Sequence, residues 1–240
     1  MITLRPAEER GHANHGWLDA NFTFSFANYY DPAWMGFRAL RVINDDIVAP
    51  GRGFGQHPHD NMEILTYMIS GSLSHNDTTG GSGAIVPGEL QHMSAGSGIY
   101  HSEQNASATT PSHSLQIWLL PTQHNVTPVY HQRKFNVAEE PNQLHLLASG
   151  ANPARNELAG RDNSFPMFTD ADLRAAILEP NHTLTHTFTR PYGYLHIVQG
   201  ELTVNGINYK SGDGLALSNE PTLTLTTTNS TAEVLLFDLD

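Results

Sequence analysis

The stretch that decides the fold is residues 51–105, GRGFGQHPHDNMEILTYMISGSLSHNDTTGGSGAIVPGELQHMSAGSGIYHSEQN. It contains two pairs of side chains that can bind a metal, His57 with His59 and His101 with Glu103. In a β-strand, residues i and i+2 point to the same face, so each pair presents two donor groups in one direction. Three imidazoles and one carboxylate that converge inside a small β-barrel form a site for a divalent metal ion. The sequence therefore predicts a metal site built from these four residues.

Short strands separated by turns are expected on either side of the ligand pairs. Apolar runs predict strands at Met62–Ile69, Ile99–Glu103 and Ser114–Leu120. This alternation of short strands and Gly- or Pro-containing turns is typical of a small antiparallel barrel. Residues 127–135, TPVYHQRKF, are interpreted as a connector.

The chain before these strands is rich in aromatic side chains, namely Trp17, Phe22, Phe24, Phe26, Tyr29, Tyr30, Trp34 and Phe37. We expect most of these rings to pack in the core and a share of them to line a pocket for a flat aromatic ligand. Ala39–Ile43 follows as a strand that is expected to end at Asn44-Asp45-Asp46, because Asn and Asp favour turns.

The last part of the chain, residues 183–240, repeats the β pattern without the ligand pairs. Strict alternation in Thr183–Thr189 and Thr222–Thr227 is strand-like, and Asn205-Gly206 is a hairpin signal. For Asp170–Leu178, DADLRAAIL, we favour a short helix, with a strand as the alternative.

Composition excludes several classes of site. The formal net charge of −12 argues against direct binding to nucleic acid or to an anionic membrane, since phosphate binding needs basic patches. The chain has no cysteine, which excludes disulfides, zinc–thiolate sites and iron–sulfur clusters. No apolar segment has the character of a secretion signal or the length of a membrane span, and a cytoplasmic location is expected.

The ligand set indicates the kind of metal. Three neutral imidazoles and one carboxylate leave two positions open in octahedral geometry, whereas structural zinc prefers four tetrahedral donors that close the site. Fe(II) is the first choice, and Ni, Co, Mn, Cu or Zn are the alternatives. A base near the open positions could remove a substrate proton, and Glu103 is the candidate for that catalytic role.

Spacing around the ligands resembles the motifs of the cupins. Gly51-x5-His57-x-His59 matches the start of the first cupin motif, and Gly98-x2-His101-x3-Asn105 matches the end of the second. In the first cupin motif a glutamate normally supplies a ligand and a glycine follows it at the end of the strand. Here Glu63 fits one possible spacing of the motif and the following glycine fits the other. The glutamate of the first motif is therefore not matched, and Glu103 is left to replace it. Glu63 and Asn105 remain candidates for orienting the ligands.

That substitution, together with the stretches GHANHGWLDANFTFSFANYYDPAWMGFRALRVINDD, GFGQHPHDNMEILTYMISGSLSHNDTTG, MSAGSGIYHSEQN, QIWLLP and TPVYHQRKF, resembles the pirin family. The resemblance implies an all-β bicupin, two antiparallel barrels in tandem. It implies an N-terminal metal-binding cupin domain, residues 1–135, and a C-terminal degenerate cupin domain without metal, residues 136–240. The implied ligands are His57, His59, His101 and Glu103.

The resemblance also implies an activity. Bacterial pirin-like proteins are associated with quercetin 2,3-dioxygenase activity, which opens the central ring of a flavonol with O2 and releases carbon monoxide. Eukaryotic members act as iron-dependent regulators, so a regulatory protein whose metal redox state controls a protein partner is the alternative function. A cupin isomerase or metal-dependent hydrolase is a third possibility. A monomer is the expected oligomeric state.

Overall fold

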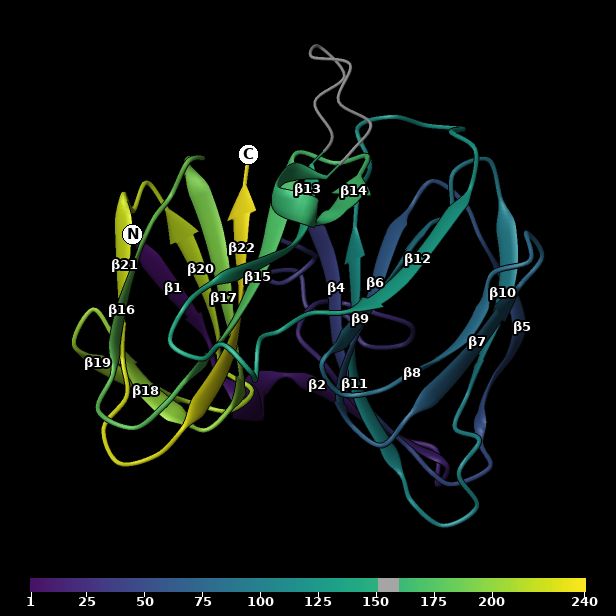
Figure 1. Ribbon diagram of the computed structural model, residues 1–240, viewed down its shortest axis with the longest axis horizontal. Helices are drawn as coiled ribbons and strands as arrows, with labels where there is room; N and C mark the ends of the chain where they lie inside the picture. The colour runs from purple at the N-terminus through teal and green to yellow at the C-terminus, as the bar shows by residue number, and fades with distance from the viewer. Residues whose placement is uncertain (151–159) are drawn as a thin grey trace. The chain divides into compact units, whose positions relative to one another are not determined.

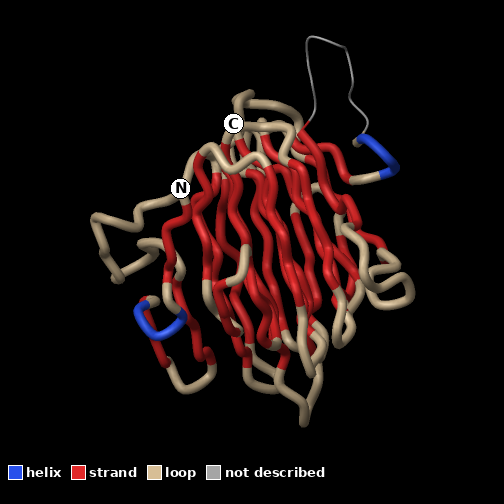
Figure 2. Tube along the Cα trace, turned by 90° about the vertical axis from the view of Figure 1, so that its left-hand side faces the viewer, coloured by secondary structure: helices blue, strands red, loops and turns tan. Residues whose placement is uncertain are grey.

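The computed structural model describes residues 1–150 and 160–240, and strands make up most of what it describes (Figure 2). The chain divides into two compact units. One, the N-terminal unit, contains Gly11–Phe135 and Met167–Thr169. The other, the C-terminal unit, contains Met1–Arg10, Asn136–Pro166 and Asp170–Asp240. The expected all-β class is confirmed.

The N-terminal unit contains two antiparallel sheets (Figure 1). The larger has the order β12-β9-β6-β11-β4-β3-β2, and its strands are β2 (Gly11–Asn14), β3 (Leu18–Phe22), β4 (Leu40–Val48), β6 (Glu63–Ser70), β9 (Glu89–Ser94), β11 (Ser112–Leu119) and β12 (Val129–Lys134). The smaller has the order β5-β10-β7-β8, and its strands are β5 (Gly53–His59), β7 (Leu73–Asp77), β8 (Ser82–Ile85) and β10 (Ile99–Gln104).

The two sheets of this unit face each other across a shared interior. Thr66 of β6 donates a hydrogen bond to Glu103 of β10, so the face of β6 that contains Thr66 points towards the smaller sheet. Ile64 and Met68 alternate with Thr66 and therefore share that face. They pack in apolar clusters with side chains of both sheets, among them Ile99 of β10 and Leu73 of β7. Burial of each such side chain contributes about 1.5–3 kcal/mol and holds the sheets together.

Most of the strands expected in this unit are present. β6, β10 and β11 confirm the predictions at Met62–Ile69, Ile99–Glu103 and Ser114–Leu120 to within two residues. The interpretation of residues 127–135 as a connector is wrong, because Val129–Lys134 forms β12 and pairs with β9. Five of the six residues of β12 are half-buried, so the segment lacks the alternation by which a strand is recognised.

The C-terminal unit also contains two antiparallel sheets. The larger has the order β1-β20-β17-β22-β15-β13-β14, and its strands are β1 (Ile2–Arg5), β13 (His145–Gly150), β14 (Phe165–Met167), β15 (Ala171–Leu178), β17 (Tyr192–Gln199), β20 (Gly214–Ser218) and β22 (Ala232–Leu239). The smaller has the order β16-β21-β18-β19, with β16 (Thr183–Thr187), β18 (Glu201–Val204), β19 (Ile207–Lys210) and β21 (Thr222–Thr226). Two short 3-10 helices, η1 (Ala7–Glu9) and η3 (Arg161–Asn163), complete the described elements.

The helix favoured for Asp170–Leu178 is wrong, since Ala171–Leu178 forms strand β15 between β13 and β22. Helix formers such as Ala, Leu and Arg carry only a weak preference, and here pairing on both sides overrides it. The hairpin predicted at Asn205-Gly206 is confirmed: it joins β18 to β19, and both residues have positive φ, 48° and 84°, as a tight hairpin turn requires.

The change of unit between Phe135 and Asn136 lies where the sequence expectation divides the chain. Residues 1–10, which were expected in the N-terminal domain, belong to the C-terminal unit, because β1 pairs with β20 and completes the larger sheet of that unit. We propose the two units as the two cupin domains, with residues 11–135 forming most of the first. Among the described residues, no helix has the length and apolar character needed to cross a membrane.

Candidate metal centre

Three histidines converge in the interior of the N-terminal unit. His57 and His59 lie two residues apart on β5, and His101 on β10 pairs directly with His57. Their ligand atoms lie within 4.8 Å of one another, and their ring centroids are 4.4–4.9 Å apart. Within the part of the chain that the structure describes, this is the one group of side chains arranged to hold a metal.

The sequence allows this arrangement because β5 lies at the edge of its sheet. Pro58, between the two histidines, has no N–H to donate, and an edge strand is where a proline is tolerated. The pairing of β5 with β10 also shifts register between His101 and Glu103, so that Glu103 lies opposite Phe54. This bulge changes the direction of Glu103 relative to His101.

Hydrogen bonding orients the ring of His57. Its Nδ1 lies 2.8 Å from the carbonyl oxygen of Gly55, and a carbonyl can only accept. Nδ1 therefore carries the proton, and the lone pair of His57 is on Nε2. A neutral imidazole with one nitrogen held by a carbonyl and the other bare is the usual form of a metal-binding histidine.

His101 is oriented by a longer chain of side chains. The amide nitrogen of Gln91, a donor, lies 2.8 Å from Nδ1 of His75, and Nε2 of His75 lies 2.9 Å from the Asp77 carboxylate. Nδ1 of His75 is therefore an acceptor. Nδ1 of His101 is 3.3 Å from it and must be the donor, which leaves the lone pair of His101 on Nε2. That Nε2 atom is buried and has no hydrogen-bond partner among the described residues.

Burial keeps the imidazoles of His59 and His101 neutral. Burial, with the neighbouring His57, lowers the pKa of His59 to about 4. Burial, with His57, His59 and His75, lowers the pKa of His101 to about 3. A metal competes with protons for the same lone pairs, so rings that resist protonation bind it over a wider pH range. Neutral rings with converging lone pairs and a buried bare Nε2 fit a divalent metal.

Glu103 lies beside the three histidines but is held differently. Its carboxylate is buried and accepts hydrogen bonds from Nε2 of Gln116 at 3.0 and 3.2 Å and from Thr66 at 3.4 Å. Burial raises the pKa of Glu103, although the hydrogen bond from Gln116 opposes the shift. The group of side chains within 4.8 Å comprises the three histidines without Glu103. Coordination by Glu103 therefore stays a proposal.

Glu63 and Asn105 form hydrogen bonds with groups other than the three converging histidines. Glu63 accepts hydrogen bonds from Ser94 and His92, 2.6 and 2.7 Å away. Asn105 is fully buried and donates to the carbonyl oxygens of Val48 and Thr110. Their hydrogen bonds join neighbouring segments of the N-terminal unit and do not reach His57, His59 or His101.

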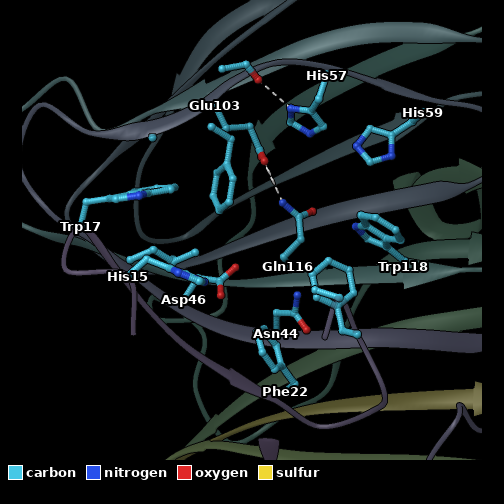
Figure 3. A pocket seen from close by; sticks show the side chains of 16 residues that line it. His15, Trp17, Phe22, Asn44, Asp46, His57, His59, Glu103, Gln116 and Trp118 are labelled. Atoms are coloured by element: carbon cyan, nitrogen blue, oxygen red, sulfur yellow. Dashed lines mark hydrogen bonds between the residues drawn. The ribbon is translucent and has the colours of Figure 1, made fainter. Parts of the chain in front are cut away.

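A pocket of about 620 Å³ opens beside the histidines. Figure 3 shows His57 and His59 on one side of it, with Trp17, Phe22 and Trp118 among its walls. The complete lining is His15, Trp17, Leu18, Phe22, Phe26, Ala27, Asn44, Asp46, Gly53, Phe54, Gly55, His57, His59, Glu103, Gln116 and Trp118. Three rings of the aromatic segment, Trp17, Phe22 and Phe26, therefore line a pocket, as expected for a share of them.

The polar residues Asn44, Asp46 and Gln116 of this lining were missed by the sequence analysis. The strand expected to end at Asn44 continues to Val48, because β4 pairs with β11 on one side and β3 on the other. Asn44 and Asp46 therefore alternate along a strand and share the face that meets the pocket. The signal available in the sequence was the apolar pair Ile47-Val48, which continues the strand beyond the three polar residues.

Comparison with known proteins agrees with this architecture. A family model described as Pirin matches residues 3–119, and one described as Quercetinase C-terminal cupin domain matches residues 158–239. A protein of Escherichia coli (strain K12) named quercetin 2,3-dioxygenase is 46% identical over 240 residues, covering 100% of this chain and 99% of that protein. A pirin-like protein of Caulobacter vibrioides is 38% identical and covers 99% of each chain.

A solved structure of similar sequence holds a metal. The crystal structure of the bacterial pirin YhhW from Escherichia coli in complex with nickel(II) has a TM-score of 0.90 and 44% identity, covering 100% of this chain and 99% of that one. A quercetin 2,3-dioxygenase from Acinetobacter baumannii, 18% identical with a TM-score of 0.76, has the same fold. The bicupin fold is thereby confirmed. The chain belongs to the pirin family and is similar to its bacterial members named quercetin 2,3-dioxygenase.

Proposed function

We propose that the protein is a metal-dependent dioxygenase that opens the central ring of quercetin or a related flavonol with O2 and releases carbon monoxide. The observation that supports this most directly is the position of the three-histidine cluster, at the side of a pocket walled by aromatic rings. Relatives at 46% identity named quercetin 2,3-dioxygenase support the same activity.

His57, His59 and His101 would hold the metal, with Glu103 as the proposed fourth ligand. Bound there, a divalent transition metal supplies a Lewis acid for the 3-hydroxyl oxygen of the substrate and a site at which O2 reacts. We propose Fe(II) as the native ion. The nickel(II) complex of the Escherichia coli pirin supports a divalent ion and makes nickel the first alternative.

Glu103 is the group that we propose removes the 3-hydroxyl proton. The rise in its pKa by burial makes this carboxylate a stronger base than an exposed glutamate, as removal of a substrate proton requires. Gln116 donates to both carboxylate oxygens, which keeps the group in place while it changes its protonation state. Loss of the proton leaves a flavonol anion. Its C2 then reacts with O2, both oxygen atoms enter the ring-opened product, and the former C3 leaves with its own oxygen as carbon monoxide.

Aromatic walls serve this reaction by excluding water. Trp118 lies edge-on to His59, with ring centroids 4.9 Å apart, and Phe26 lies edge-on to Trp118 at 5.5 Å. A flat polyphenol can stack between such rings, which give large apolar contact at a small cost in conformational entropy. An anion that reacts with O2 is then shielded from solvent.

The test is oxygen consumption with quercetin by protein reconstituted separately with Fe(II), Ni, Co, Mn and Cu. We expect metal-dependent uptake with stoichiometric carbon monoxide. His57→Ala should lose both metal and uptake, whereas Glu103→Gln should lose uptake. Protein shown to be fully loaded with each metal that consumes no oxygen would rule out this function and favour the regulatory alternative.

A further inference from the structure

Asp46 is a buried carboxyl group that faces the pocket without a hydrogen-bond partner. Its exposed fraction is 6%, it lies on β4, and it belongs to the pocket lining. Within residues 1–150 and 160–240, no hydrogen bond or ion pair reaches its side chain. Buried polar groups in native proteins are nearly always hydrogen-bonded, so a group that is not calls for an explanation.

A structural explanation does not account for it. The neighbouring Asp45 has the same side chain, and its carboxylate is bound by His113 at 2.6 Å on the opposite face of β4. Asp46 contributes no such contact, and burying it costs free energy that folding does not recover. A leucine of similar size would suit a purely structural position better.

Its place in the pocket indicates what the carboxyl could meet. Figure 3 shows Asp46 on the side of the drawn side chains where His15 and Trp17 lie, and His57 and His59 on the other side, with Glu103 and Gln116 between them. The rest of the lining is mainly aromatic, with Phe22, Phe54 and Trp118 among it. A flat ring system held by the histidines at one end would therefore bring its far edge towards Asp46.

Asn44 strengthens the polar character of this end. It precedes Asp46 on the same face of β4, is 3% exposed, and its Oδ1 has no hydrogen-bond partner among the described residues. Asn44 and Asp46 thus place side-chain oxygen atoms side by side along one strand and form a polar strip in a mostly apolar wall. Such a strip favours a ligand that places a hydroxyl group against it. An analogue without that hydroxyl would leave the buried polar groups unpaired, and this is the main free-energy cost of binding it.

We propose that Asp46 is the residue that determines specificity, by bonding to a phenolic hydroxyl of the substrate other than the one held at the metal. The preferred substrates are then aromatic compounds with a second hydroxyl-bearing ring edge, rather than those that carry only the hydroxyl bound at the metal. The bond forms in either protonation state, since a carboxylate accepts from a phenol and a carboxylic acid also donates to one. This inference rests on the proposed function for the placement of the substrate.

The experiment compares two ligands on three proteins. The two ligands are quercetin, which has hydroxyls on both outer rings, and 3-hydroxyflavone, which has none there. Their binding is measured by anaerobic titration of zinc-loaded protein, so that no turnover occurs. The proteins are the wild type, Asp46→Leu and Asp46→Asn. We expect the preference of the wild type for quercetin to fall about tenfold in Asp46→Leu, the loss of one hydrogen bond, and to be partly kept in Asp46→Asn.

Asp45→Asn is the matched control, because it removes a carboxylate at the adjacent position on the other face of the strand. Its ligand preference should equal that of the wild type. A structural defect in Asp46→Leu would weaken the binding of both ligands alike. An unchanged ratio of the two affinities in this variant would therefore overturn the inference while leaving the proposed function intact. Failure of the zinc-loaded wild type to bind either flavonol would overturn both.

Discussion

Nδ1 of His101 lies 3.3 Å from Nδ1 of His75, so a histidine that binds no metal determines which nitrogen of His101 is bare. The contact follows from strand pairing: β7 pairs with β10 so that Asp77 lies opposite His101 and His75 lies opposite Glu103. Asp77 is anchored in turn by the backbone N–H groups of Thr79 and Gly81. The series of contacts from Asp77 through His75 to His101 therefore links the three-histidine cluster to a turn of the smaller sheet.

His75→Ala should lower the affinity for the metal about 10- to 100-fold, because His101 loses the partner that orients it. Asp77→Asn should have a smaller effect in the same direction. The measurement is a competition titration of the metal-free protein with a chelator of known affinity.

His92→Ala is the control for the loss of a buried histidine. His92 is fully buried in the same unit and pairs with the carboxylate of Glu63, which makes no hydrogen bond to His57, His59 or His101. It should lower stability while the affinity for the metal stays that of the wild type. Equal loss of metal in the His75 and His92 variants would contradict the orienting role.

Trp17→Ala should weaken flavonol binding about tenfold and change kcat much less, because the ring provides apolar contact away from the histidines. Trp17 packs edge-on against Phe54 with ring centroids 5.2 Å apart, so its removal opens one wall of the pocket. Steady-state kinetics with quercetin would separate KM from kcat. Tyr30→Ala, which removes an aromatic ring that is 72% exposed and outside the pocket, should leave both unchanged.

Stability should depend on pH through Asp46. Burial, with the nearby Glu103 and Asp45 carboxylates, raises the pKa of Asp46 to about 8, whereas in the unfolded chain it is about 4. Between these values the unfolded state releases a proton that the folded state keeps, so this group lowers the free energy of unfolding as pH rises. Asp46→Asn in metal-free protein should therefore match the wild type near pH 4 and exceed its Tm increasingly up to about pH 8.

Thermal unfolding in a series of buffers measures this difference. Asp170→Asn, at an exposed aspartate of the C-terminal unit, should show no such growth with pH. A constant gap between the wild type and Asp46→Asn would show that Asp46 does not carry the effect.

Asn105→Ala should cost about 2–4 kcal/mol of stability without changing the affinity for the metal. The side chain is fully buried, and its loss leaves the carbonyl groups of Val48 and Thr110 without their donor. Chemical denaturation and metal titration of the same preparation would measure the two quantities. A selective loss of metal at near-normal stability would instead support the ligand-orienting role that the sequence analysis considered.

Strand recognition from the sequence succeeded where one face is apolar and failed where pairing alone defines the strand. The strand in Met62–Ile69 is a run of buried apolar residues that only a strand or buried helix explains, and the turn at Gly71 resolves that choice. Val129–Lys134 is half-buried along most of its length and has no such pattern. Ala171–Leu178 is mostly buried, but its Ala, Leu and Arg residues suit a helix equally well, and pairing with strands distant in the chain decides its conformation.

The sequence by itself determined the three histidines that converge, because the spacing of two residues places His57 and His59 on one face of any strand they form. It also determined the family and the absence of thiolate chemistry, since both follow from residue identity. Only the tertiary structure decided the surroundings of the cluster. His75 reaches His101, and Asp46 and Gln116 reach the pocket beside the cluster, through pairings between strands far apart in the chain. Register across such distances is set by packing of the whole sheet rather than by any local signal.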